Sequence, residues 1–211
     1  KPKNIYVLPN GINRDIIKKP QKEKIVMFVG RLVEEKGAHL FSKAIINIQK
    51  KFPDWRFYII GTSKAGLKKL STRYEKVVVS SFLKIGNQAK YFGFLPNYRV
   101  KKIMESSSIL VVPSIWDDPF PLTALEGLAS GQAIIASKRG GLVEMLKNTG
   151  LLIDDITSKK IELKLLKLMK DKDKLIYYQN KSWKNFKYHQ KDISKKQDLL
   201  RKKIFNFFIN K

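Results

Sequence analysis

Two cations lie five residues apart in a short polar segment, residues 30–37. Arg31 and Lys36 come soon after an apolar run, and Gly37 precedes an amphipathic stretch. An arginine guanidinium binds an anion through a planar fork of donors, and a lysine ammonium binds it as a point charge. The pair is therefore a candidate diphosphate-binding site. The alternative is two ordinary surface cations, since the chain carries 43 Lys and Arg residues.

A second candidate segment, residues 113–126, follows another apolar run and contains three prolines and the acidic pair Asp117 and Asp118. This composition favours a strained loop that ends at a helix N-terminus, where free backbone N–H groups bind anions. Glu126 falls about one turn further along that helix, where a buried carboxylate needs donors such as sugar hydroxyls. The alternatives are helix capping by Asp118 and an ordinary solvated Glu126.

A third segment, residues 137–144, follows the apolar run 133–136 and contains Gly140 and Gly141. Paired glycines let a backbone approach a ligand closely, and they also occur in purely structural turns. In an open parallel sheet, ligands bind outside the carboxyl ends of the strands, where the strand order reverses. Three polar segments that each follow a strand therefore predict one ligand-binding crevice.

Short apolar runs alternate with amphipathic stretches through the first three quarters of the chain. This alternation is typical of repeated strand–helix units and predicts an α/β fold, with a Rossmann-like parallel β-sheet flanked by helices. The expected strands are Ile5–Leu8, Ile25–Val29, Trp55–Ile60, Ala89–Phe92, Ile109–Val112, Ala133–Ala136 and Gly150–Leu152. The expected helices are Ala38–Lys51, Arg99–Glu105, Leu122–Ser130 with a stop at Gly131, and Leu142–Leu146.

Two further regions complete the predicted organisation. The segment Thr72–Ile85 contains three consecutive valines, which favour a strand, but its apolar residues also fit helical spacing, and we predict a helix. From residue 158 onward the pattern is helical and rich in lysine, with 17 cations and five acids between Lys159 and Lys211. We therefore expect a Rossmann-like domain over residues 1–157 and a basic helical tail over residues 158–211.

The composition excludes several classes of protein. The chain has 211 residues, 43% of them hydrophobic, which is enough for a sizeable core. It has no cysteine, which excludes disulfides, thiolate metal sites and a cysteine nucleophile. Its apolar runs are far shorter than the roughly 20 residues of a membrane span. Lys1–Tyr6 lacks the apolar stretch of a signal peptide, and a reducing cytoplasm fits these features.

The net charge of +25 raises the question of a polyanionic partner. Only seven of the cations are Arg, and the lysines are spread along the chain, as is typical of a solvated surface. Base-specific recognition of nucleic acid favours clustered Arg with interleaved aromatic residues, so we expect no specific nucleic-acid partner. An anionic membrane surface or another polyanion is the alternative.

The ordered set of short motifs resembles the C-terminal domain of the retaining GT-B glycosyltransferases of family four, the group 1 transferases. The resemblance covers roughly residues 5–155, and the order of the motifs is more specific than any one of them. The matching motifs are Val7-Leu8-Pro9-Asn10-Gly11-Ile12, Phe28-Val29-Gly30-Arg31-Leu32, Glu35-Lys36-Gly37, Phe57-Tyr58-Ile59-Ile60-Gly61, Tyr91-Phe92-Gly93-Phe94-Leu95-Pro96, Val112-Pro113-Ser114, Asp118 to Gly127, and Gly140-Gly141-Leu142-Val143-Glu144.

The resemblance implies transfer of a glycosyl group, with retained configuration, from a nucleoside diphosphate sugar of the UDP, GDP or ADP type. Arg31 and Lys36 match the family's diphosphate-binding pair, which stabilises the leaving nucleotide. Asp118 and Glu126 match the acids of its E-x7-E motif, which contact the donor sugar and the ribose. The catalytic set carried over is Arg31, Lys36, Asp118 and Glu126; the donor-binding set is Gly30, Arg31, Lys36, Phe92, Gly93, Phe94, Phe120, Pro121, Leu122 and Glu126, with the base near Phe92–Leu95.

Two residues depart from the family pattern. Asp118 is one methylene shorter than the usual Glu, and Pro121 replaces a common Gly and has no N–H to offer a ligand. The pair Asp117–Asp118 is adjacent, unlike a metal-binding D-x-D, and GT-B enzymes are metal-independent. The resemblance therefore implies no metal and no cofactor, with the nucleotide sugar as donor substrate.

The resemblance also implies partners outside this sequence. The chain begins near the expected hinge strand, so we expect that an N-terminal acceptor-binding domain is missing and that the isolated chain is inactive. The expected acceptor is a glycan or lipid-linked glycan of a cell-surface polysaccharide or lipopolysaccharide. His39 and His189 are expected at the surface.

The basic tail leaves a second hypothesis open, that of a non-enzymatic module that binds nucleic acid or an anionic membrane. Phe205, Phe207 and Phe208 lie among lysines and suit either a bilayer surface or the missing domain. The protein is expected in the cytoplasm, with the inner face of the membrane as a peripheral location.

Overall fold

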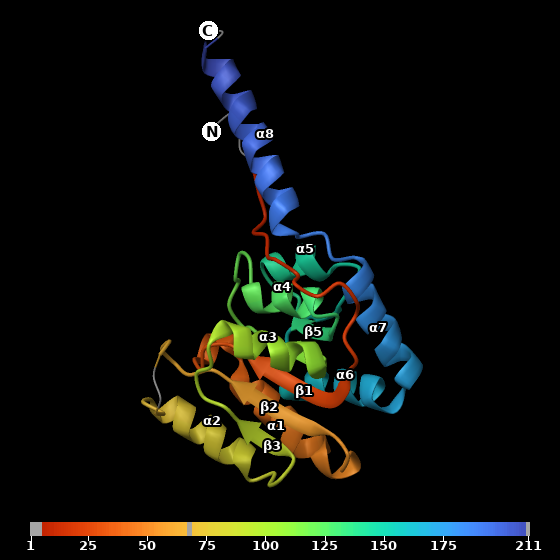
Figure 1. Cartoon of the computed structure of the whole chain (residues 1–211). Coiled ribbons are helices and arrows are strands. Elements are labelled where there is room, and N and C mark those ends of the chain that lie inside the picture. Colours follow the sequence, from red (N-terminus) through yellow and green to blue (C-terminus); the bar gives the residue numbers. More distant parts are fainter. Residues whose placement is uncertain (1–5, 67–68, 210–211) are drawn as a thin grey trace.

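The centre of the molecule is a six-stranded sheet of parallel strands. The computed structural model of the chain describes residues 6–66 and 69–209. Neighbouring strands follow the order β3-β2-β1-β4-β5-β6 (Figure 1). The predicted α/β class with a Rossmann-like parallel sheet is confirmed. The strands are β1 (Glu23–Val29), β2 (Arg56–Ile60), β3 (Ala89–Tyr91), β4 (Ser107–Val112), β5 (Ala133–Ser137) and β6 (Leu151–Ile153).

The strands are apolar over nearly their whole length because helices cover both faces of the sheet. β4 and β5 are buried at every position. Six of the predicted strands lie where the sequence placed them, with ends that differ by a few residues. The seventh, Ile5–Leu8, is wrong for residues 6–8, which form no strand, while Ile5 lies outside the described residues. Val7 is 85% exposed, and residues 6–8 belong to neither the sheet nor its core.

The helices agree with the predicted alternation, and the ambiguous segment 72–85 contains one. Thr72 Oγ1 accepts a hydrogen bond from the Glu75 N–H at 3.1 Å, and the Glu75 carboxylate accepts one from the Thr72 N–H at 2.9 Å. This reciprocal capping box starts the helix and decides against the strand. Gly131, at a φ of 70°, follows the end of α4 as predicted. The helices are α1 (Ala38–Ile48), α2 (Arg73–Leu83), α3 (Asn97–Ser106), α4 (Leu122–Ala129), α5 (Gly141–Leu146), α6 (Ser158–Lys170), α7 (Lys172–Lys184) and α8 (Gln190–Ile209), with 3-10 turns η1 (Glu34–Lys36) and η2 (Gln49–Lys51).

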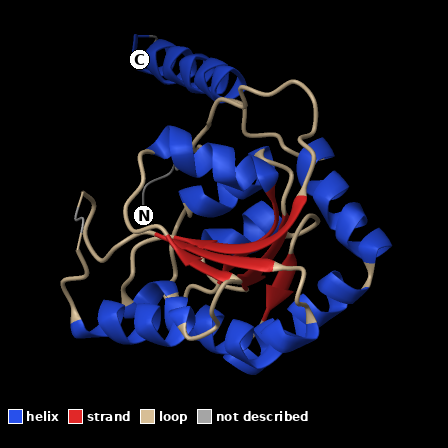
Figure 2. Cartoon of the chain, turned by 60° about the horizontal axis from the view of Figure 1, so that its bottom comes forward, coloured by secondary structure: helices blue, strands red, loops and turns tan. Residues whose placement is uncertain are grey.

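Helices lie on both sides of the sheet (Figure 2). Phe41 of α1, Phe82 of α2 and Leu165 of α6 belong to the apolar core on one face. Met104 of α3 and Leu125 of α4 belong to the core on the other face, together with residues of α5. This arrangement leaves the carboxyl ends of the strands, and the loops that follow them, free to form a crevice.

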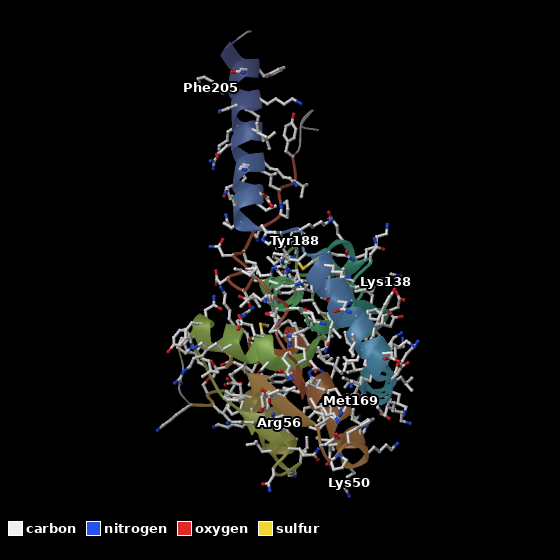
Figure 3. The ribbon with its side chains drawn as sticks, turned by 45° about the vertical axis from the view of Figure 1, so that its right-hand side comes forward. Lys50, Arg56, Lys138, Met169, Tyr188 and Phe205 are labelled. Atoms are coloured by element: carbon white, nitrogen blue, oxygen red, sulfur yellow. The ribbon has the colours of Figure 1, made fainter. Side chains whose placement is uncertain are left out.

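The C-terminal helices have two different positions. α6 packs against α1, and α7 packs beside β5 and α4. α8 extends away from this body (Figure 1). At its base, the N–H of Ile12 donates to the Tyr188 carbonyl at 2.9 Å, and the N–H of Gln190 donates to the Ile12 carbonyl at 3.1 Å. Figure 3 shows Tyr188 near this junction and Phe205 far along α8.

Candidate functional site

A cavity of 430 Å³ opens where the strand order reverses, between the carboxyl ends of β1 and β4. This is the position at which open parallel sheets bind ligands. Seven of the sequence-predicted site residues line it: Gly30, Arg31, Lys36, Asp118, Phe120, Pro121 and Leu122. The remaining lining residues are Phe28, Val29, Val112, Ser114 and Thr123.

The loop after β1 is fixed directly on the loop after β4. Gly37 has a φ of 71°, and a Cβ atom there would lie 2.0 Å from the carbonyl oxygen of Pro113. The Glu35 carbonyl accepts hydrogen bonds from the Ile115 N–H at 2.8 Å and from Ser114 Oγ at 3.1 Å. Only glycine permits this close approach, which carries Lys36 to the second loop.

Lys36 and Asp118 form an ion pair inside the cavity. Lys36 Nζ lies 2.7 Å from Asp118 Oδ2, and Asp118 Oδ1 accepts a hydrogen bond from the Phe120 N–H at 3.1 Å. The Asp118 side chain is therefore held between a cation and the loop that precedes α4.

The paired glycines predicted as a third ligand loop pack against the second loop. The Gly141 N–H donates to the Asp118 carbonyl at 2.8 Å. A Cβ atom would lie 2.4 Å from the Asp118 carbonyl oxygen at Gly140, and 2.0 Å from the Pro119 carbonyl oxygen at Gly141. The glycines therefore let one backbone pack on another beside the cavity.

The first turn of α4 points donors at the same cavity. Leu122 and Thr123 line it, and the first intrahelical bonds to the Pro121 carbonyl come only from Ala124 and Leu125. The N–H groups of the first helical residues thus have no partner within the helix, and they carry the partial positive charge of a helix N-terminus. Pro121 offers no N–H but directs the chain into the helix.

Arg31 is the cation without a protein partner at this crevice. Within residues 6–66 and 69–209, its exposed guanidinium has no hydrogen bond or ion pair. Arg31 also lines a second cavity, of 190 Å³, which shares Val29 and Gly30 with the first. An anion bound at Arg31 would therefore contact both cavities.

The second cavity is mostly apolar. It receives Phe94 and Leu95 from the loop after β3, as predicted for Phe94. The other predicted residues of this loop are not lining residues of this cavity: Phe92 packs edge-on against Tyr58, and the Gly93 carbonyl accepts a hydrogen bond from the Gly61 N–H at 2.7 Å. Ile60 and Val100 also line this cavity, as do Gly61, Thr62 and Ala65, three residues that were not predicted as site residues. These three residues follow β2, so the same rule about carboxyl ends could have identified them.

Glu126 is not a lining residue of either cavity. It lines a small space of 20 Å³ together with Lys101 of α3 and residues 12–16. Burial raises the pKa of its carboxyl group, and the nearby Lys101 charge opposes that shift. In the described part of the chain, no hydrogen bond or ion pair satisfies this carboxylate. Glu126 is therefore not among the residues that line the cavity with Arg31 and Lys36.

The described residues contain no group of three or more His, Asp or Glu side chains placed to hold a metal ion.

A parallel sheet wound in both directions from its centre, with a cationic crevice at the reversal point, defines a Rossmann-like ligand-binding domain. Within that class, the chain belongs to the glycosyl transferases group 1 family, whose model matches residues 10–188.

The chain is also similar in sequence and in fold to individual proteins. The chain is 22% identical over 204 residues to a lipopolysaccharide 1,2-N-acetylglucosaminetransferase of Salmonella typhimurium, covering 86% of this chain and 54% of that protein. The solved C-terminal domain of LpcC, a group 1 glycosyl transferase from Francisella tularensis, superposes with a TM-score of 0.67 and 26% identity, covering 80% of this chain and 88% of that one. Anabaena Alr3699/HepE in complex with UDP superposes with a TM-score of 0.73 and 18% identity, covering 86% of this chain and 49% of that one, and supports the fold. The chain thus spans about half the length of the Salmonella and Anabaena proteins.

Proposed function

We propose that the chain is the donor-binding half of a glycosyltransferase and binds a nucleoside diphosphate sugar in this crevice. The observation that carries the proposal is the pair of adjoining cavities that share Arg31. One offers cations and helix N–H groups, which suit a diphosphate, and the other offers apolar side chains, which suit a flat base. The UDP in the Alr3699/HepE structure supports a uridine nucleotide as the first candidate.

Arg31 and Lys36 are the proposed diphosphate ligands. The unpaired guanidinium of Arg31 suits a bidentate contact with phosphate oxygens. Lys36 exchanges Asp118 for a phosphate in this scheme, which leaves the Asp118 carboxylate to accept hydrogen bonds from the donor sugar. Both cations then stabilise the negative charge that develops on the leaving diphosphate.

Glu126 is the proposed acceptor of hydrogen bonds from the ribose. Its half-buried carboxylate lacks a donor among the described residues, and hydroxyl groups would supply one. Gly30, Phe120, Pro121 and Leu122 are proposed to line the diphosphate and sugar positions. Phe94 is proposed to contact the base, and Phe92 and Gly93 are proposed to hold its loop through their contacts with Tyr58 and Gly61.

The whole protein is proposed to transfer a sugar with retained configuration and without a metal. The Salmonella relative, whose name assigns it to lipopolysaccharide, supports a glycan or lipid-linked glycan as acceptor. Because a second half is needed to bind the acceptor, we expect no transfer by this chain alone.

Calorimetric titration with UDP, GDP and ADP and their sugar conjugates tests the donor proposal. We expect one nucleotide to bind, and its affinity to fall by about tenfold or more in Arg31→Ala and in Glu126→Ala. Arg56→Ala is the matched control, since Arg56 begins β2 at the opposite end of the sheet and pairs with Glu23 at the surface (Figure 3). Unchanged affinity in Arg31→Ala would contradict the proposal.

A separate proposal concerns α8, which we propose as the contact of this protein with a membrane surface or with another domain. Of the described helices, none is long and apolar enough to span a membrane. Leu199 and Phe205 are exposed on α8 among lysines, which suits an anionic lipid surface or another domain. Binding of polyanions through α8, the alternative function, would depend on salt and would be unaffected by Arg31→Ala.

A further inference from the structure

Glu75 is a buried carboxylate outside the crevice whose hydrogen bonds reach one wall of it. Its side chain is 0% exposed in the first turn of α2. Oε1 accepts a hydrogen bond from the Ser63 N–H. Oε2 accepts from the N–H groups of Ser71 and Thr72 at 2.8 and 2.9 Å, and from their hydroxyls at 3.0 and 3.3 Å.

The two oxygens therefore hold different parts of the chain. Oε2 completes the capping box with Thr72, which is a local device that starts the helix. Oε1 bonds a residue 12 positions earlier, on the segment that follows β2. Helix capping does not require this second bond, because Ser63 is not part of α2 or of its cap.

Ser63 lies within the wall of the apolar cavity, which we define as residues 61–65. Gly61, Thr62 and Ala65 of this wall line the cavity. The Leu32 N–H donates to the Thr62 carbonyl at 3.0 Å, so the wall is tied to the loop that carries Arg31. On the opposite side, the Ser63 N–H donates to Glu75, and the Ser63 hydroxyl lies 3.0 Å from the Ser71 hydroxyl at the surface.

The wall has little room to move toward the sheet. A Cβ atom on Gly61 would lie 2.0 Å from the Gly30 carbonyl oxygen. The Tyr91 hydroxyl donates to the Gly61 carbonyl at 3.1 Å, and burial, with the Glu75 charge, raises the pKa of Tyr91 to about 12, so this hydroxyl stays protonated. Release of Ser63 would therefore let the wall move outward and widen the cavity.

We propose that Glu75 is a positioning residue of the donor site, which holds wall 61–65 where the base binds and thereby sets the selectivity among nucleotide bases. The inference rests on the proposed donor function and deepens it. Base recognition then depends on a carboxylate that does not touch the nucleotide.

A carboxylate is required because every group that faces Glu75 in these bonds is a donor. Glutamine with its oxygen in the place of Oε2 keeps the capping contacts but turns its own N–H groups toward the Ser63 N–H. Glu75→Gln therefore removes the buried backbone tie of the wall and retains the cap, and it leaves only the exposed contact between the Ser63 and Ser71 hydroxyls. Thr72→Ala is the matched control, because it removes the capping hydroxyl and leaves the bond between Glu75 and Ser63.

The test compares the unsubstituted chain, Glu75→Gln and Thr72→Ala. It measures their affinities for UDP, GDP, ADP and inorganic pyrophosphate, and the hydrogen-exchange rates of the amides in wall 61–65. In Glu75→Gln we expect the ratio of the affinity for the tightest-binding nucleotide to the affinity for the second to fall by about tenfold. The affinity for pyrophosphate should stay within about twofold, since Arg31 and Lys36 are untouched, and amides 62–65 should exchange faster. Thr72→Ala should lower the melting temperature and leave the ratio unchanged.

Two results would overturn the proposal. One is an unchanged nucleotide ratio in Glu75→Gln with faster exchange of the wall, because the wall would then move without affecting selectivity. The other is unchanged exchange, because Glu75 would then not hold the wall. If the unsubstituted chain binds neither nucleotides nor pyrophosphate, the donor function itself is contradicted, and the inference falls with it.

Discussion

Lys36 and Asp118 neutralise each other in the crevice, and a bound diphosphate would compete with the carboxylate for the lysine. Their side chains are 24% and 21% exposed, so a ligand can reach the pair from solvent. In a partly buried position, a neighbouring negative charge disfavours an anion by several-fold in affinity. Asp118 therefore weakens binding of the free diphosphate, and its benefit is expected only when a sugar supplies hydroxyl donors.

Asp118→Asn should consequently bind UDP tighter than the unsubstituted chain, by about threefold to tenfold. The asparagine oxygen can still accept the Phe120 N–H, so the loop should keep its conformation. The extra affinity that a sugar conjugate has over UDP should decrease at the same time. Calorimetry with UDP and UDP-glucose measures both effects.

Asp117→Asn is the matched control for this substitution. Asp117 precedes Asp118 in the sequence, is exposed, and does not line the cavity. Its Oδ2 lies 3.9 Å from Arg139 Nη1. We expect no change in either affinity. Weaker UDP binding in Asp118→Asn would show that the ion pair supports the site rather than competing with its ligand.

The sequence could predict some of these residues because the rule about strand ends needs only the strands. Arg31, Lys36 and Asp118 each follow a strand, and the structure brings them to one cavity. The place of Glu126 could not be predicted, since the direction of a helical side chain depends on how α3 packs and on where Lys101 lies. The packing of Phe92 against Tyr58 could not be predicted for the same reason, because the two residues are distant in sequence.

At the scale of elements, Glu75 has two roles in α2. It completes the capping box at the start of the helix, and it accepts a hydrogen bond from Ser63 in the segment that follows β2. Burial alone would raise the pKa of Glu75, but the N–H groups of Thr72, Ser63 and Ser71 outweigh it and lower the pKa to about 2. The folded protein thus binds this proton less readily than the unfolded chain, where the ordinary value is 4.5.

The stability that Glu75 contributes should therefore be complete above about pH 4.5 and should decline as the pH falls toward about 2, by about 3 kcal/mol in total. In this window the unfolded state binds more protons than the folded state. The free energy of unfolding therefore decreases as the pH decreases. Urea unfolding of the unsubstituted chain and Glu75→Gln, at about pH 6 and about pH 3, measures the effect. The difference between the two proteins should shrink at the lower pH, and a constant difference would refute this account.

Elements with a local signal were predictable. Strands β1 to β6 appear as apolar runs because both faces of the sheet are covered, and the capping box of Thr72 and Glu75 marks the start of α2. The apolar run Ile5–Leu8 carries the same local signal as a strand. It is not one over residues 6–8, since pairing depends on a free sheet edge next to it, which a local pattern does not report.

At the scale of the whole molecule, α8 is the element that the body does not cover. Leu199 and Phe205 are 67% and 63% exposed on it. Apolar side chains on a projecting helix favour association, so we expect the 211-residue chain to self-associate as its concentration rises.

Light scattering measures this association. The double substitution Leu199→Ser and Phe205→Ser should reduce it, because it removes the exposed apolar surface. Lys202→Ser, on the same helix, controls for a general effect on α8. Equal association of the double variant would assign the contact to another surface.

The packing of α6 on α1 has a consequence for the order of events during synthesis. The two helices form one layer on the sheet, but α1 ends at Ile48 and α6 begins at Ser158, so 109 residues separate them. At a translation rate of about 5–20 residues per second, roughly 5–20 s pass before the ribosome has made the partner of α1. During that time Phe41 and Ile45 have only part of their final cover. The apolar face of α1 is therefore prone to aggregation until α6 has been made.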